Sequence, residues 1–264
     1  MNSAIRKAVI LVTVWSALIS LLLAPVNALR ARACSQEARD KLLEEAINAV
    51  AGFAPSSSAK ELFTRALATR GEAVAGDKKA IFWQELKAKP ELARTLVYEA
   101  DSVQSQKVLK IIRPVLDLYA RDWDVAVLQQ KAPFVGTFRQ CIFIVSTGLL
   151  RLVSDEELMG FAAHELAHEC FIEELREADR LHCAYAYHLV ELKSDLVATL
   201  CCLLLKNEPL AIVSGVTRIE SFYLNNDSSV LKEYTHPDSS VRRHGIELFL
   251  TKINKSPFSS QSSK

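Results

Sequence analysis

The hydrophobic and polar positions follow two different patterns along the chain. Over residues 29–120 apolar residues recur at helical spacing, as in SQEARDKLLEEAINAVAGF (35–53), and this predicts a series of amphipathic helices. The pattern changes at Trp123. WDVAVL (123–128) and CIFIVSTG (141–148) are short, apolar and rich in β-branched residues, and the segment between them contains proline and glycine. These features predict two short strands joined by a loop.

Helical spacing returns after the second of these strands. Ser154 and Glu157 form an S-x-x-E capping box, which predicts the start of a helix that runs through FAAHELAHEC (161–170). Further helices are predicted over residues 182–206, 210–224 and 237–254. The sequence therefore predicts an α+β fold that is mainly α, with a small β element.

The first residues have the features of an export signal. Arg6 and Lys7 precede an uncharged apolar run over residues 8–24, and small residues follow at Val26–Ala28. We expect a signal peptide over residues 1–28, cleaved after Ala28. The alternative is an N-terminal membrane anchor, because the apolar run is near the short end for a membrane span. Both interpretations predict an exported protein in the periplasm or outside the cell, and the second predicts membrane association.

The remaining chain divides into three parts. Residues 29–121 form a helical region without obvious chemistry, residues 122–254 form the core that carries the candidate site, and the serine-rich residues 255–264 are expected to be a disordered tail. The formal net charge of +1 gives no electrostatic basis for binding nucleic acid. Among six cysteines no CxxC pair occurs, and Cys170 with Cys183 is one candidate disulfide in an exported protein.

The sequence HELAH carries the clearest chemical signal. His164 and His168 are four residues apart, so on a helix their imidazoles share one face. That spacing supplies two of the ligands of a tetrahedral zinc ion. Glu165 lies beside the same face, where it can take a proton from a metal-activated water and pass it to the leaving amine. The H-E-x-x-H motif thus predicts one catalytic Zn²⁺ and peptide hydrolysis.

A catalytic zinc site needs a third protein ligand, and the next helix offers candidates. Glu191 can bind the metal, and Asp195, one turn later, can accept a hydrogen bond from a ligand histidine and fix its ring. His188 and His182 are alternative third ligands. A solvated acidic edge, with Glu191 paired to Lys193, is also compatible with the sequence alone.

Four segments in order resemble the M48 family of zinc metallopeptidases, the HtpX-like group. They are STGLL (146–150), SDEELMGFAAHELAHE (154–169), ELKSD (191–195) and THPDSSVRR (235–243). The resemblance covers roughly residues 122–250 and implies a zincin-like fold with zinc on His164, His168 and Glu191. It implies Glu165 as the general base.

The resemblance also assigns roles near the C-terminus. His236 matches a histidine that lies near the metal and can stabilise the developing oxyanion, and Arg242 matches an arginine that forms a supporting ion pair. Two positions depart from the family pattern: Ala132 stands where an asparagine is usual, and Ser194 stands where an alanine is usual.

The sequence thus predicts a zinc metalloendopeptidase whose substrates are proteins or peptides, such as misfolded proteins of the cell envelope. The alternative is a zinc-retaining binding or chaperone-like module that cuts little, for which the departures from the family pattern leave room. The strand at residues 141–148 is either an exposed edge that pairs with substrate or a fully paired core strand.

Overall fold

A computed structural model describes most of the chain after the expected export signal. The described residues are 36–52, 57–71, 76–88, 96–98, 100–226 and 236–254. The segment expected to be a signal or anchor (1–28) and the expected disordered tail (255–264) lie outside these ranges. No helix within the described ranges is long and apolar enough to cross a membrane. The fold is mainly helical with one small sheet, which confirms the predicted class of α+β, mainly α.

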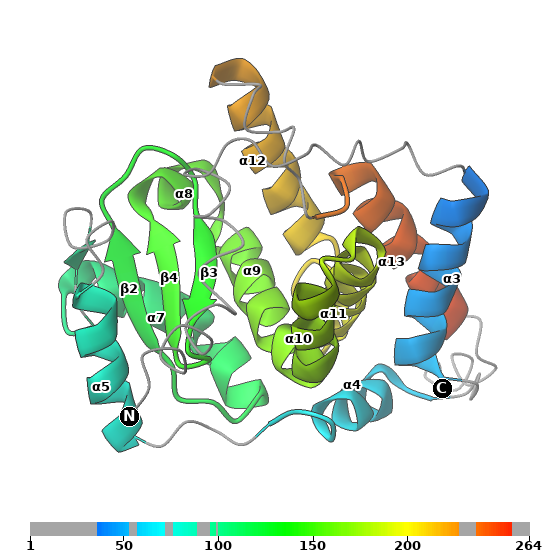
Figure 1. Cartoon of the computed structure of the whole chain (residues 1–264), viewed down its shortest axis with the longest axis horizontal. Helices are drawn as coiled ribbons and strands as arrows, with labels where there is room; N and C mark the ends of the chain where they lie inside the picture. The colour runs from blue at the N-terminus through cyan, green and yellow to red at the C-terminus, as the bar shows by residue number, and fades with distance from the viewer. Residues whose placement is uncertain are drawn as a thin grey trace, which may run out of the picture.

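The sheet has four strands in the order β1-β2-β4-β3. Figure 1 labels β2, β4 and β3 side by side in that order. The strands are β1 (Leu96–Tyr98), β2 (Asp124–Leu128), β3 (Val135–Phe138) and β4 (Ile142–Ser146). The central pair, β2 and β4, is parallel, and the two outer pairs are antiparallel.

The two-strand prediction was therefore incomplete. β1 lies in the region that was expected to be entirely helical, and β3 lies in the expected loop. Both strands are short, so each gives only a weak local signal. β3 also directly follows a segment whose proline marks a turn, and this favoured a loop there. Pairing with β2 and β4 supplies the stabilisation that their own sequences lack.

The strand predicted over residues 141–148 is a core strand. β4 pairs with β2 on one side and with β3 on the other, so the interpretation as an exposed edge was wrong. Thr147 and Gly148 do not continue the strand. They begin helix α8 (Thr147–Leu152), whose first turn is capped by Ser146 Oγ accepting from Leu149 N at 3.0 Å.

The described part of the N-terminal region contains four helices in addition to β1. They are α3 (Gln36–Ala51), α4 (Ala59–Leu67), α5 (Gly76–Lys87) and α7 (Val103–Leu118). Helices α3 and α4 pack on α11 (Ala184–Leu205), and α7 packs on β2 and on α9 (Asp155–Ala167). Their buried side chains belong to the same hydrophobic core as the C-terminal part of the chain. This region therefore contributes directly to the environment of α9 and α11.

The remaining helices follow the predicted order. After α9 come the 3-10 turn η2 (His168–Phe171), α10 (Ile172–Leu181), α11, α12 (Ala211–Asn226) and α13 (Ser239–Asn254). The Ser154–Glu157 capping box starts α9 as predicted. Helix α10 was not predicted. The expectation that HELAH lies wholly within one α-helix was wrong at its last residue, because His168 caps α9 and opens the turn.

The candidate disulfide does not form. Cys170 and Cys183 are both free, as are the other three cysteines in the described part of the chain. Cys201 and Cys202 are buried in α11, where they act as small core residues.

The close approach of α8 to the loop after β2 gives a test of this packing. Replacing Gly148 with alanine should lower the free energy of unfolding by about 1–3 kcal/mol, because backbone must move to admit the methyl group. A Cβ added at Gly148 would lie 2.1 Å from the carbonyl oxygen of Lys131. Thermal unfolding followed by circular dichroism measures the change.

Gly71→Ala is the matched control for this substitution. An added Cβ at Gly71 meets nothing within 4 Å, so this variant should unfold at the parent temperature or slightly above it. Parent-like unfolding of Gly148→Ala would contradict the described contact.

Candidate metal centre

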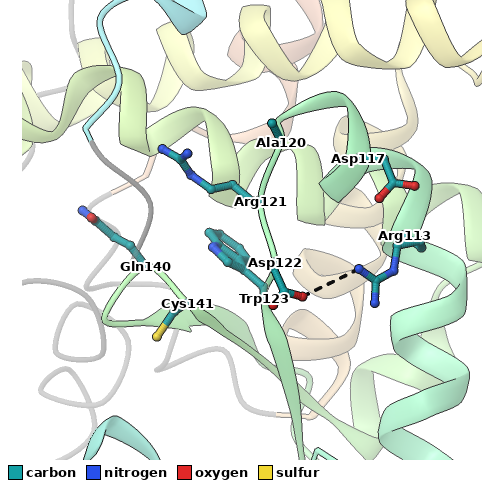
Figure 2. Close-up of a pocket in the computed structure, with 8 residues that line it drawn as sticks. All are labelled: Arg113, Asp117, Ala120, Arg121, Asp122, Trp123, Gln140 and Cys141. Atoms are coloured by element: carbon teal, nitrogen blue, oxygen red, sulfur yellow. Dashed lines mark ion pairs between the residues drawn. The ribbon is translucent and has the colours of Figure 1, made fainter. Parts of the chain in front are cut away.

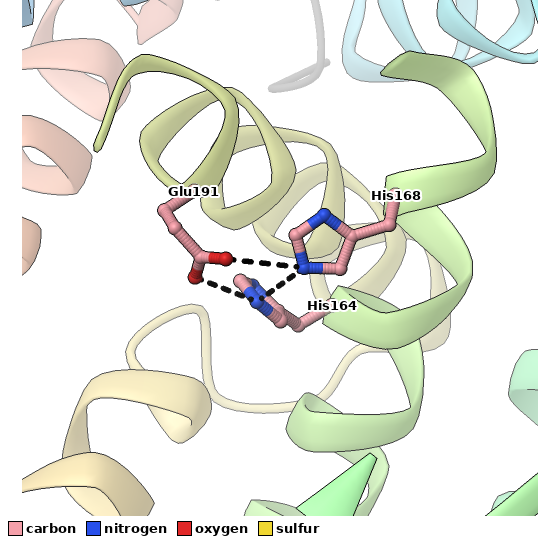
Figure 3. A group of neighbouring side chains, drawn as sticks. All are labelled: His164, His168 and Glu191. Atoms are coloured by element: carbon pink, nitrogen blue, oxygen red, sulfur yellow. Dashed lines mark hydrogen bonds and ion pairs between the residues drawn. The ribbon is translucent and has the colours of Figure 1, made fainter. Parts of the chain in front are cut away.

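Three side chains converge on one point, from α9, from the turn η2 that follows it and from α11 (Figure 3); His164 and Glu191 are buried and His168 is partly buried. The Nε2 atoms of His164 and His168 are 3.1 Å apart. The carboxylate oxygens of Glu191, from the middle of α11, lie 3.3 Å from His164 Nε2 and 3.5 Å from His168 Nε2. His168 has αR backbone angles, so the helical spacing of the two histidines is kept although α9 ends at Ala167. The three residues could hold a metal ion.

The spacing of these donor atoms fits a tetrahedral metal ion. Bonds of about 2.0–2.1 Å at tetrahedral angles place neighbouring ligand atoms about 3.3–3.4 Å apart. The two imidazole nitrogens are 3.1 Å apart, and the Glu191 carboxylate approaches them at 3.3 Å through Oε2 and 3.5 Å through Oε1, which is around this value. Two imidazole nitrogens and a carboxylate also form a donor set that suits zinc and several other transition metals. The geometry therefore supports a metal without identifying the element.

The carboxylate of Asp195 fixes the ring of His164. Asp195 is fully buried one turn after Glu191, and its Oδ1 lies 2.8 Å from His164 Nδ1. When Nδ1 carries the proton donated to Asp195, the lone pair of Nε2 is directed at the cluster, as a metal ligand requires.

Arg242 of α13 compensates the buried charge of Asp195. Its Nε donates to Asp195 Oδ2 at 2.7 Å, and its Nη2 donates to Oδ1. Burial alone would raise the pKa of Asp195, but Arg242 and His164 outweigh it and lower that pKa below its usual value. Burial likewise disfavours charge on His164, yet the bonds to Asp195 and Glu191 raise the pKa of His164 to about 9 in the metal-free protein.

Ser194 provides a corresponding contact for the second histidine. Its Oγ lies 3.1 Å from His168 Nδ1, and the serine is fully buried. Burial lowers the pKa of His168 to about 4, so this ring is neutral at physiological pH, as a metal ligand must be. The departure from alanine to serine at this position thus gives His168 a polar neighbour, a role that the sequence did not suggest.

His236 and Glu165 lie beside the cluster. His236 Nδ1 is 3.0 Å from Glu191 Oε2, and 40% of its side chain is exposed. Burial raises the pKa of Glu191, but His236, His168 and His164 together lower it well below its usual value, so Glu191 is an anion. Glu165 follows His164 in α9 and is partly buried, and burial raises its pKa.

The alternative third ligands do not join the cluster. His182 is exposed at the left-handed C-cap of α10, with φ of 48°. His188 lies outside the group of converging donors, and its buried Nε2 has no hydrogen-bond partner within the described chain. Lys193 pairs with Glu174, which removes the alternative of a Glu191–Lys193 surface pair.

No protein-family model matches the chain, and no curated protein shows significant similarity to it. The resemblance to the M48 peptidases therefore rests on the short sequence motifs alone.

Zinc binding by two variants on α11 tests the assignment of the third ligand. We expect one zinc ion per chain in the parent, and Glu191→Gln should weaken its binding by at least about tenfold because the amide loses the ligand's charge. Equilibrium dialysis with metal analysis measures both.

His188→Gln is the matched control, one turn earlier on the same helix, and it should bind zinc like the parent. Loss of zinc by His188→Gln with retention by Glu191→Gln would reverse the assignment.

Proposed function

We propose that this chain is a zinc-dependent metalloendopeptidase of the M48 type, with one Zn²⁺ on His164, His168 and Glu191. The observation that carries the proposal is the convergence of three donors at tetrahedral spacing, with a glutamate directly after the first histidine. Structural zinc sites usually have four protein ligands, whereas a three-ligand site leaves a position for water or substrate. The described part of the chain brings three such donors together here.

When bound, zinc would polarise the scissile carbonyl and make the attacking water more acidic. The protein supplies the proton transfers. Glu165 is the general base. It directly follows His164 on the helix that carries the first ligand, and burial raises its pKa, which makes its carboxylate more basic. Glu165 then returns the proton to the leaving amine.

His236 is proposed to assist charge stabilisation. Its ring stands at the border between Glu191 and solvent, where it can reach the oxygen of a bound carbonyl. The contact with Glu191 gives it a second role, since it orients a ligand carboxylate. Asp195 and Arg242 act further from substrate, by holding the ring of His164.

The proposed substrates are proteins or peptides in extended conformations. Within the described sheet the terminal strand nearest α9 is β3, so β3, and not β4, is the edge to which an extended peptide could add. Unfolded or misassembled proteins of the cell envelope fit this requirement and the expected export signal.

The Glu165→Gln variant separates the peptidase from a zinc-retaining binding module. Removing the base should lower casein hydrolysis by about 10²–10⁴-fold, while zinc content and unfolding temperature stay at parent values because Glu165 is not a ligand. Glu173→Gln, an exposed glutamate on α10, is the matched control and should cut like the parent.

Zinc binding without hydrolysis by the parent would favour the binding module. Equal hydrolysis by the parent and Glu165→Gln would contradict the proposed mechanism.

A further inference from the structure

The helix that carries the first two ligands ends where the second ligand begins. Helix α9 stops at Ala167, and His168 starts the 3-10 turn η2, which has no side-chain cap at its N-terminus. The backbone N–H of His168 still donates to the carbonyl of His164, but the α-helical pattern ends there and a 3-10 turn follows. Contacts from outside α9 therefore help to hold this turn, and with it the ring of His168.

Such contacts come from the N-terminal region. Tyr119 Oη donates to the carbonyl of Ala163, the residue before His164, at 3.1 Å. Arg121 Nε donates to Glu169 Oε2, directly after His168, at 2.7 Å. Thr69 Oγ1 donates to the carbonyl of Cys170 at 3.0 Å. These three residues, Thr69, Tyr119 and Arg121, form a bracket that contacts both ends of the HELAH segment.

The contact of Arg121 is the strongest part of the bracket. Arg121 and Glu169 are 9% and 5% exposed, and Arg121 Nη2 also lies 2.6 Å from the same carboxylate oxygen. A buried ion pair resists separation because either partner alone would leave an uncompensated charge. Arg121 Nη2 donates to the carbonyl of Gly71 as well, at 2.6 Å, which ties the turn to the chain after α4.

The bracket is itself held together. Arg70 donates to the carbonyl of Tyr119, which links the segment after α4 to the segment after α7. Figure 2 shows the guanidinium of Arg121 pointing away from the Arg113–Asp122 ion pair, on the wall of a cavity of about 520 Å³. The residues of the metal cluster do not line this cavity. The guanidinium is already paired with Glu169 and Gly71, so these bonds, and not a cavity ligand, account for its orientation.

We propose that the bracket sets the spacing of the metal ligands, with Arg121 as the main positioning residue. This inference rests on the proposed metal site but not on peptidase activity. Without Arg121 the η2 turn loses its charged anchor, His168 shifts relative to His164, and the donor atoms no longer converge at the spacing that a small ion requires.

The test compares zinc affinity of the full chain and its variants by competition with a chromophoric chelator. Arg121→Gln should raise the zinc dissociation constant by about tenfold or more, as loss of supporting contacts does at other metal sites. Tyr119→Phe removes one hydroxyl from the same bracket and should weaken zinc in the same direction by a smaller factor. It decides the question if Arg121→Gln fails to fold.

The matched control is Arg218→Gln. Arg218 Nε donates to Glu157 Oε1 at 2.8 Å in the first turn of α9, so this variant loses an ion pair on the same helix but far from the ligands in sequence. It should keep the parent affinity. Visible spectra of the Co²⁺-loaded proteins should be the same for parent and Arg218→Gln and altered for Arg121→Gln, which a purely structural loss of stability would not produce.

Three results would overturn the inference. If Arg121→Gln folds and binds zinc like the parent, the positioning role is excluded and the metal site stands. If Arg121→Gln does not fold, parent-like affinity in Tyr119→Phe leads to the same conclusion. Equal weakening in Arg218→Gln would show a general loss of stability. A parent that binds no zinc would instead overturn the proposed metal site, and the inference with it.

Discussion

The rest of the site depends on the contacts that the buried carboxylate of Asp195 makes with His164 and Arg242. Asp195 lies fully inside the protein, where an unpaired charge costs on the order of several kcal/mol. Two partners from distant segments of the chain compensate its charge. His164 comes from α9 and Arg242 from α13, so one carboxylate joins three helices. Formation of the metal cluster and docking of the last helix are therefore parts of the same packing arrangement.

Helix α11 accommodates this polar group because its polar residues are placed in register. Ser194 and Asp195 lie three and four residues after Glu191, and all three contact the ligand histidines. Most of the neighbouring helix residues are buried and apolar. Glu191, Ser194 and Asp195 each contact a ligand histidine, so these buried polar groups support one another. The same face orients both ligand histidines through Asp195 and Ser194, and burial keeps the ring of His168 neutral.

The features that sequence alone could predict are those encoded by local spacing. The His164–His168 pair, the Ser154 cap and the Glu191–Asp195 pair follow from helical periodicity, and the structure places them as that periodicity requires. Strands β1 and β3 escaped prediction because pairing with distant strands stabilises them. The roles of Tyr119 and Arg121 were equally hidden, since their partners lie 44 and 48 residues away and no motif links them. The Cys170–Cys183 pairing was wrong because spacing in sequence does not determine where two thiols lie.

X-ray absorption at the zinc edge on the zinc-loaded chain tests the central claim most directly. We expect one zinc with nitrogen and oxygen ligands at about 2.0–2.1 Å, including the scattering pattern of two imidazoles, and no sulfur. A sulfur shell at about 2.3 Å would mean that cysteines hold the metal, and a zinc without imidazole scattering would mean that it is bound elsewhere. Either result would contradict a metal centre built on His164, His168 and Glu191.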